Sequence, residues 1–174
     1  MNKDIKEILF SEEDIKNICK KLGEEITKDY EGKEPLFICL LKGAAPFMTD
    51  LVKYVDLKCT LDYLRVKSYE GTESTGKLKV IGELPDVKGK DVILVEDILD
   101  TGNTLYKIKH YFNEAASVKI VVLLDKPTGR KYPITADYVG DLVPPKFVVG
   151  YGLDYNENYR NLPYIGVLKE EVYM

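Results

Sequence analysis

Three short, predominantly apolar runs constrain the fold of this chain most strongly. They are Leu36–Leu41 (LFICLL), Val92–Val95 (VILV) and Val118–Leu124. Runs without polar alternation are typical of strands buried on both faces of a parallel sheet. Between the second and third runs, apolar side chains recur at helical spacing, at Leu105, Ile108, Phe112 and Ala115. The alternation predicts an α/β fold with a mostly parallel central sheet flanked by helices.

The flanking segments complete this pattern. Ser11 precedes Glu12, Glu13 and Asp14, which predicts a capped helix with acids in its first turn that ends by Gly32. A second helix is predicted from Ala44 to about Tyr54, with Pro46 in its first turn. Further strands are predicted at Cys59–Lys67, Leu78–Gly82, Val139–Val143, Phe147–Val149 and Tyr164–Leu168. The polar segment Ser68–Lys77 between the first two is predicted to be a mobile loop.

Length and composition limit the class of protein. A chain of 174 residues fits a single domain, 1–174. The net charge of −4 argues against a protein that coats nucleic acid, so we expect no nucleic-acid partner. We also expect no signal peptide and no membrane span. The cysteines, Cys19, Cys39 and Cys59, have neither the spacing nor the neighbouring histidines of a zinc site, which favours reduced thiols and a cytoplasmic location.

The segment Val92–Leu105 carries the chemical information. A buried strand is predicted to end in Glu96 and Asp97, and the loop Asp100–Thr104 leads into a helix. Ligands bind at the carboxyl ends of strands in open α/β sheets. A glycine-containing loop at a helix start offers backbone N–H groups to a phosphate. A simple alternative is an acidic strand end followed by an Asp-capped helix. No GxxxxGK[ST] sequence is present, which argues against a P-loop ATPase.

This segment resembles the signature of the type I phosphoribosyltransferases, a hydrophobic strand, two acids and a D-x-x-D-T-G-x-T loop. Other motifs in the same order resemble the hypoxanthine-guanine branch of that family, and together they cover nearly all of the chain from Leu36 to Leu168. They are Leu40–Gly43, Lys67–Tyr69 with the ESTG that follows, Leu124–Lys126, Lys146–Glu157 and Arg160. The resemblance implies the type I phosphoribosyltransferase fold with a small hood formed by terminal segments. The C-terminal segment from about 126 to 170 would contribute its purine-binding part.

The resemblance also implies roles around the sugar and its phosphates. Glu96 and Asp97 would contact the ribose hydroxyls and a Mg²⁺ with its water shell. Asp154 would bind a second Mg²⁺, and Arg160 would hold pyrophosphate through its fork of donors. Further substrate contacts would come from backbone and loop groups at Lys42, Gly43, Thr101, Gly102, Asn103 and Thr104. Asn103 stands where relatives often carry Lys or Arg.

Another set of residues would handle the base. Asp100 would act near N7 as general base or proton acceptor. Lys126 would donate to O6 and so select 6-oxopurines over 6-aminopurines. Phe147 would stack on the purine, and backbone groups of Val148 would read its edge. Ser68 and Tyr69 would close over the reacting centre and exclude water.

Two other functions are less consistent with the sequence. A non-enzymatic regulator that senses phosphoribosyl pyrophosphate and binds nucleic acid would need an extensive basic face or an added DNA-binding domain, and this acidic single-domain chain shows neither. Lys126 and the stretch Lys146–Tyr155 argue against a transferase for adenine or orotate. His110 is expected to be an exposed surface residue. Lys126, Arg130 and Lys131 form a basic cluster for which a solvated loop is favoured over RNA contact. The resemblance implies a homodimer or homotetramer that acts on small-molecule substrates.

Overall fold

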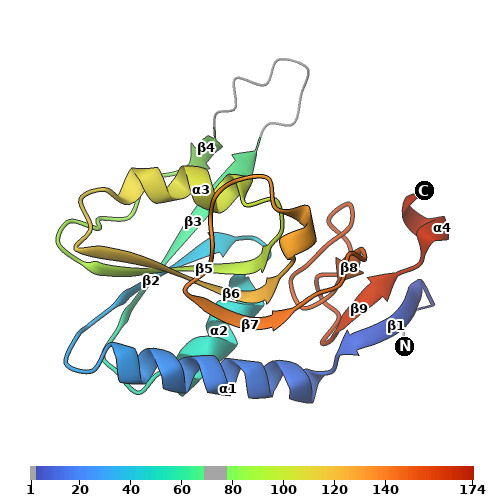
Figure 1. Cartoon of the computed structure of the whole chain (residues 1–174), viewed down its shortest axis with the longest axis horizontal. Helices are drawn as coiled ribbons and strands as arrows, with labels where there is room; N and C mark the ends of the chain where they lie inside the picture. Colours follow the sequence, from blue (N-terminus) through green and yellow to red (C-terminus); the bar gives the residue numbers. More distant parts are fainter. Residues whose placement is uncertain (1–2, 69–77) are drawn as a thin grey trace.

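A six-stranded sheet and a three-stranded sheet organise the fold (Figure 1). The structure is a computed structural model that describes residues 3–68 and 78–174. The larger sheet has the order β4-β3-β2-β5-β6-β7. Every neighbouring pair in it is parallel except β3 with β4. The prediction of a mostly parallel central sheet is therefore confirmed. Its strands are β2 (Leu36–Leu41), β3 (Thr60–Ser68), β4 (Leu78–Ile81), β5 (Asp91–Leu99), β6 (Ser117–Asp125) and β7 (Tyr138–Leu142).

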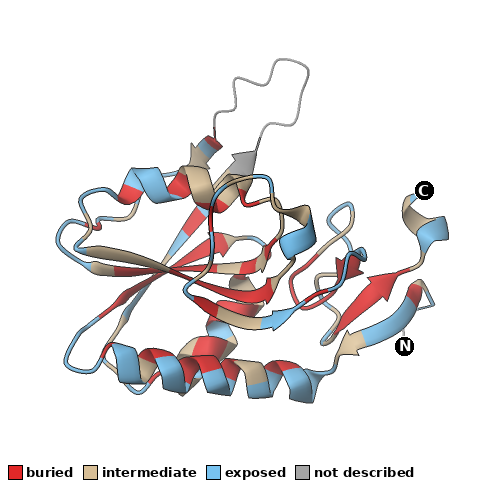
Figure 2. Ribbon diagram, viewed as in Figure 1, coloured by how far each residue is buried: buried red, intermediate tan, exposed pale blue. Residues whose placement is uncertain are grey.

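Helices cover both faces of the larger sheet. On one face lie α1 (Glu12–Asp29) and α2 (Ala45–Leu51), which continues into the 3-10 turn η1 (Val52–Tyr54). On the other lie α3 (Asn103–Lys109) and the 3-10 turn η2 (His110–Phe112) (Figure 1). Alternate β2 residues therefore enter two separate cores, which explains the continuous apolar run: Phe37 and Cys39 face α1 and α2, and Ile38 and Leu40 face α3. Figure 2 shows the buried residues concentrated in the strands between these helices.

Helix α1 begins at the predicted cap. The Ser11 hydroxyl accepts a hydrogen bond from the Asp14 backbone at 3.2 Å, and Asp14 accepts one from the Ser11 backbone at 2.8 Å. This reciprocal pair is a capping box with Asp in place of the commoner Glu. The helix ends at Asp29, before the predicted limit, because Tyr30 leaves the helical conformation and the chain turns at Gly32 with φ of 76°.

The smaller sheet joins the two ends of the chain and forms the predicted hood. Its order is β1-β9-β8, with β1 (Ile5–Phe10) antiparallel to β9 (Ile165–Leu168) and β9 antiparallel to β8 (Val148–Val149). The short helix α4 (Glu170–Tyr173) follows β9. The sequence did not predict β1. Within residues 126–170, the 3-10 turn η3 (Pro127–Gly129) follows β6, and β7 belongs to the larger sheet rather than to the hood.

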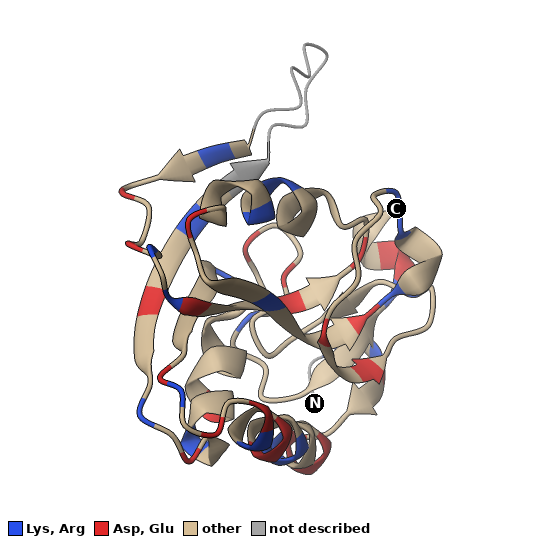
Figure 3. Cartoon of the chain, turned by 60° about the vertical axis from the view of Figure 1, so that its left-hand side comes forward, with Lys and Arg blue, Asp and Glu red and all other residues tan. Residues whose placement is uncertain are grey.

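Charges of both signs alternate on the exposed side of α1 (Figure 3). The Lys16–Glu13 and Lys20–Glu24 pairs lie there at 4.0 Å, and their side chains stay largely in solvent. His110 is exposed, as predicted. No helix within residues 3–68 and 78–174 is long and apolar enough to cross a membrane.

Removing the α1 cap should lower stability without touching the site. Ser11→Ala leaves the first-turn N–H groups without their side-chain acceptor, so the free energy of unfolding should fall by about 1 kcal/mol. Urea unfolding followed by circular dichroism measures the change. Glu25→Ala, at an exposed position in the middle of the same helix, should stay within about 0.5 kcal/mol of the parent. Equal losses in both variants would contradict the role of the cap.

Candidate active site

Strand β5 extends further than predicted and carries the paired acids inside it. Pairing with β6 continues through Ile98 opposite Leu124 and Leu99 opposite Asp125. The prediction that the strand ends at Glu96 and Asp97 was therefore wrong, since this ladder overrides the poor strand propensity of two acids. The loop begins at Asp100, immediately after the strand.

The two acids affect each other's ionisation. Asp97 is only 9% exposed, and its carboxylate accepts a hydrogen bond from the Ile98 backbone at 2.7 Å. Burial raises the pKa of Glu96 well above its usual range, and the neighbouring Asp97 charge adds to this. Burial also raises the pKa of Asp97. Part of the Glu96 side chain still reaches solvent, so the rise reflects crowding as well as loss of water. A cation bound between these acids would relieve both effects.

The turn after β2 packs directly against Asp97. The Leu41–Lys42 peptide bond is cis. A Cβ at Gly43 would lie 1.8 Å from Asp97 Oδ2, so only glycine allows this approach. A Cβ at Gly152 would likewise lie 2.0 Å from the Gly43 carbonyl oxygen. Gly43, one of the predicted substrate-binding residues, thus lies between Asp97 and Gly152, and Lys42 directly precedes it.

The predicted phosphate loop lines a small cavity of about 150 Å³, here called the loop cavity. Gly102 stands at the start of α3 with φ of 81°, a conformation that favours glycine. Thr101 Oγ1 accepts a hydrogen bond from the Asn103 backbone at 3.3 Å. Asn103 Oδ1 is buried without a hydrogen-bond partner among the described residues. The cavity is lined by Glu96, Ile98, Leu99, Asp100, Thr101, Gly102, Asn103, Thr104 and Leu105.

A second cavity of about 260 Å³, here called the hood cavity, adjoins the first, because Ile98 and Asp100 line both. Inside it, Lys126 Nζ lies 3.7 Å from Asp100 Oδ2 and donates to the Lys146 carbonyl oxygen at 3.3 Å. A donor and a carboxylate therefore stand side by side in one concave site. The remaining lining residues are Asp97, Phe147, Val148, Leu153 and Asp154.

Phe147 is held by other rings of the hood. Its ring stacks on Tyr173 of α4 with centroids 5.0 Å apart, and it meets Tyr155 edge-on at 5.6 Å. Phe147 nevertheless keeps 37% of its surface exposed and lines the hood cavity. An oriented, partly exposed ring suits a stacking surface. Sequence reasoning did not predict that Tyr173 supports it.

A third cavity of about 330 Å³, here called the cation cavity, is lined by Lys42, Arg65 and Arg160 with Leu41, Val66 and Glu157. Lys42 Nζ lies 2.5 Å from Glu157 Oε2, and this hydrogen bond lowers the pKa of the Glu157 carboxyl. Arg160 Nη2 forms ion pairs with Asp154 Oδ1 at 2.9 Å and with Glu157 Oε1 at 3.3 Å. Three cationic side chains thus surround a space suited to a multiply charged anion.

Ser68 is the last residue of β3, and Tyr69 lies outside the described residues, so the predicted closure over the site stays a prediction.

The prediction of a solvated loop for Arg130 was wrong. Its guanidinium is largely buried and donates hydrogen bonds to the main-chain carbonyl oxygens of Leu99, Asp100 and Ile134.

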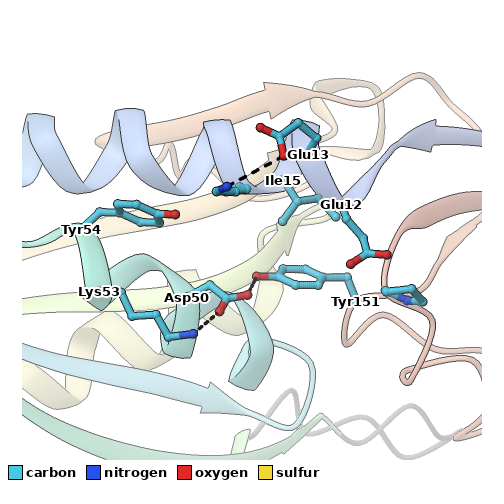
Figure 4. A pocket seen from close by; sticks show the side chains of 9 residues that line it. Glu12, Glu13, Ile15, Asp50, Lys53, Tyr54 and Tyr151 are labelled. Carbon is cyan, nitrogen blue, oxygen red and sulfur yellow. Dashed lines mark hydrogen bonds and ion pairs between the residues drawn. The ribbon is translucent and has the colours of Figure 1, made fainter.

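A fourth cavity of about 470 Å³ lies between α1, α2 and the 151–163 segment (Figure 4). Tyr151 donates its hydroxyl proton to Asp50 at 2.6 Å, and Asp50 also pairs with Lys53 at 2.8 Å. Burial raises the pKa of Tyr151, and its bond to Asp50 raises it further. Because these polar groups satisfy one another, the contacts tie the 150–154 segment to α2 rather than present groups for catalysis.

Comparison with known proteins agrees with this geometry. The model of the phosphoribosyl transferase domain matches residues 6–156. The hypoxanthine-guanine phosphoribosyltransferases of Streptococcus thermophilus and Staphylococcus aureus are each 53% identical to the chain, over 99% of it and at least 98% of their own lengths. A crystal structure of hypoxanthine phosphoribosyltransferase from Staphylococcus aureus superposes with a TM-score of 0.94, at 53% identity, over 98% of this chain and 95% of that one. The Trypanosoma cruzi enzyme superposes with a TM-score of 0.93, at 38% identity, over 99% and 96%.

The fold, the loop after β5 and the paired acids define a phosphoribosyltransferase. The chain belongs to the hypoxanthine-guanine phosphoribosyltransferase family and is an enzyme of purine salvage. The alternative of a non-enzymatic regulator is not favoured.

Substitution of Gly43 should impair the enzyme while leaving it folded. In Gly43→Ala the new Cβ would displace the Asp97 carboxylate, so phosphoribosyl transfer should fall by about tenfold or more, since small misplacements of positioned groups are costly. Steady-state kinetics measure the loss.

Gly32→Ala is the matched control for Gly43→Ala. Gly32 has φ of 76° and nothing within 4 Å of its would-be Cβ. This variant should lose about 1 kcal/mol of stability to backbone strain and keep its kinetic constants. Unchanged kinetic constants in Gly43→Ala would show that the close contact with Asp97 does not affect phosphoribosyl transfer.

Proposed function

We propose that the chain transfers the 5-phosphoribosyl group from phosphoribosyl pyrophosphate to N9 of a 6-oxopurine. Hypoxanthine and guanine are the expected bases, with xanthine a third candidate, and the products are IMP or GMP and pyrophosphate. The observation that carries the proposal is the Lys126–Asp100 pair in the hood cavity, 3.7 Å apart, beside the exposed ring of Phe147.

The hood cavity is the proposed base site. The Lys126 ammonium has only donors, so it pairs with a 6-oxo group and leaves a 6-amino group without an acceptor. Asp100 accepts the proton at N7, which makes N9 more nucleophilic. Phe147 stacks on the ring, and the backbone of Val148 faces its edge. A buried donor selects against a base that cannot accept from it more strongly than an apolar pocket could.

The other two cavities are the proposed sites of the phosphates. The loop cavity, from Thr101 to Thr104, holds the 5′-phosphate through backbone N–H groups and hydroxyls. The cation cavity holds pyrophosphate through Lys42 and Arg160, with the backbone of Gly43, next to Lys42 in the chain, as a further donor. In the free protein Glu157 forms ion pairs with Lys42 and Arg160. Pyrophosphate would therefore compete with this carboxylate for the two cations. Ser68 and Tyr69 are proposed to close the site against water.

The donor set fits magnesium. Glu96 and Asp97 would supply carboxylate oxygens, which Mg²⁺ prefers, to one ion, and Asp154 would supply them to a second. The crowded Glu96–Asp97 pair favours a cation. Within residues 3–68 and 78–174 no three His, Cys, Asp or Glu side chains form a complete ligand cluster. The proposed ions would therefore need waters and substrate oxygens to complete their coordination. When bound, magnesium supplies neutralisation of the pyrophosphate charge.

The proposed reaction is a single displacement at C1′. The bond from C1′ to the pyrophosphate oxygen breaks as N9 forms its bond, through a transition state with oxocarbenium character. The N7 proton passes to Asp100, and Arg160 stabilises the charge that develops on the departing pyrophosphate. The electrons of the broken bond leave with pyrophosphate, so no covalent intermediate with the protein is needed.

Assembly and location are further expectations. We propose a homodimer or homotetramer in the cytoplasm. Exposed apolar side chains on β3, Leu61 and Tyr63, offer surface that an assembly could bury. The free thiols of Cys19, Cys39 and Cys59 fit a reducing compartment.

A product assay tests the proposed function. Phosphoribosyl pyrophosphate is supplied with hypoxanthine, guanine, xanthine, adenine or orotate, with magnesium present or removed by a chelator. We expect nucleotide from the 6-oxopurines, little from adenine or orotate, and loss of turnover without magnesium. Turnover of adenine or orotate in preference to hypoxanthine would contradict the assignment of the base site.

Lys126→Ala should damage base recognition selectively. The lost charged donor should raise KM for hypoxanthine about tenfold or more, as expected for a hydrogen bond worth about 1.5–3 kcal/mol. The Kd of phosphoribosyl pyrophosphate, measured by calorimetry, should stay close to that of the parent. An equal loss in both parameters would show that Lys126 is structural.

Asp100→Asn should act on the chemical step. The amide keeps the shape of the side chain but cannot accept the proton, so kcat should fall about 100-fold or more with a smaller change in KM. Single-turnover kinetics with hypoxanthine measure the step. Parental kcat in this variant would remove Asp100 from the proton transfer.

A further inference from the structure

The Arg130 guanidinium makes four hydrogen bonds from a largely buried position, with 19% of its side chain exposed. Nε donates to the Asp100 carbonyl oxygen at 2.9 Å, and Nη1 donates to the Ile134 carbonyl oxygen at 2.6 Å. Nη2 donates to the Leu99 carbonyl oxygen at 3.2 Å and to the Asp125 carboxylate. One side chain therefore donates to three main-chain carbonyl groups and to one partly buried carboxylate, and the Leu99 carbonyl oxygen also accepts from the Lys126 backbone at 3.0 Å.

These acceptors lie at the ends of two neighbouring strands. Leu99 of β5 and Asp125 of β6 are register partners. The residue after Leu99 is Asp100, and the residue after Asp125 is Lys126. Arg130 thus donates hydrogen bonds both to the end of β5, which is followed by Asp100, and to the end of β6, which is followed by Lys126. These are the two groups whose separation decides how a base fits.

The same loop touches the Asp100 side chain. A Cβ at Gly129 would lie 1.7 Å from Asp100 Oδ1, so the backbone at Gly129 packs against this carboxylate. The backbone N–H groups of Lys131 and Tyr132 both donate to the Thr101 carbonyl oxygen, at 2.9 and 3.1 Å. Residues 129–132 therefore hold the first two residues of the loop after β5 from several sides.

Arginine suits this position because of its geometry. Its planar fork presents five N–H donors in fixed directions, so it can serve acceptors on different segments at once. A lysine offers one nitrogen at the end of a flexible stem and cannot reach all four acceptors. Without Arg130, the Asp125 carboxylate, of which 18% is exposed, would also lack its cation.

We propose that Arg130 is a positioning residue that fixes Asp100 and Lys126 relative to each other and so sets the orientation of the base. The inference rests on the roles proposed above for these two residues. Arg130 itself lies outside the lining of the loop and hood cavities and acts through its neighbours.

Arg130→Lys tests this role, since it keeps the charge and removes the fork. We expect KM for hypoxanthine to rise and kcat to fall, each by about tenfold, while the Kd of phosphoribosyl pyrophosphate changes less than about twofold. Asp125→Asn keeps an acceptor for Arg130 but loses the charge, and it should shift the same constants in the same direction by a smaller factor. It also provides the test if Arg130→Lys does not fold.

Lys131→Ala is the matched control, because Lys131 is exposed and its contact with Thr101 uses only the backbone. Its constants should equal those of the parent. If Arg130 only stabilised the fold, its variants would give less active enzyme and a lower apparent kcat, and the KM values for hypoxanthine and for phosphoribosyl pyrophosphate would stay unchanged. That result would overturn the proposal. Unchanged hypoxanthine KM and kcat in Arg130→Lys would overturn it as well. A parent enzyme without turnover of any base would instead remove the proposed function, and this inference with it.

Discussion

Parallel pairing of β5 with β2 on one side and β6 on the other brings distant parts of the sequence to one edge of the sheet. Cys39 lies opposite Val95, and Leu99 lies opposite Asp125. The chain leaves all three strands at that edge, so the turn at Lys42–Gly43, the loop from Asp100 and the segment from Lys126 emerge together. A change of register by one residue would turn each strand's side chains to the opposite face and separate these groups.

Close packing between these segments then sets the finer positions. Gly43 lies against the Asp97 carboxylate, Gly152 against the Gly43 carbonyl oxygen and Gly129 against the Asp100 carboxylate. A Cβ at any of these glycines would collide with the group it faces, so the turn after β2, the 150–154 segment and the segment after β6 pack closely around Asp97 and Asp100. Arg130 ties the segment after β6 to the Asp100 carbonyl oxygen, and the Tyr151–Asp50 hydrogen bond ties the 150–154 segment to α2. These contacts fix the positions of the paired acids, Asp100 and Lys126 relative to the sheet.

Most strands and helices of the fold were predictable from local sequence. Apolar runs such as Leu36–Leu41 predicted the sheet because burial on both faces requires them, and Ser11 with Asp14 predicted the start of α1. Strand β1 was missed because Ile5–Phe10 has little apolar periodicity and depends on pairing with β9, about 160 residues away. The end of β5 was misplaced for a similar reason, since its last residues are held by β6 rather than by their own propensity.

The groups of the proposed base site were predicted from motifs, whereas the residues that support them were not. Asp100 and Lys126 lie in one cavity as the resemblance implied. Arg130 looked like a surface cation because its partners are mostly backbone carbonyl groups, which leave no signal in a side-chain pattern. Tyr173 gave no signal either, because its contact with Phe147 exists only once the chain ends meet in the hood.

A crystal structure of an unreactive complex would test the central claim most directly. The complex would contain phosphoribosyl pyrophosphate, magnesium and a 6-oxopurine analogue with carbon in place of N9, which cannot form the glycosidic bond. The account predicts the base in the hood cavity against Phe147, with O6 within hydrogen-bonding distance of Lys126 Nζ and N7 within reach of the Asp100 carboxylate. A base bound elsewhere, or with O6 turned away from Lys126, would contradict it.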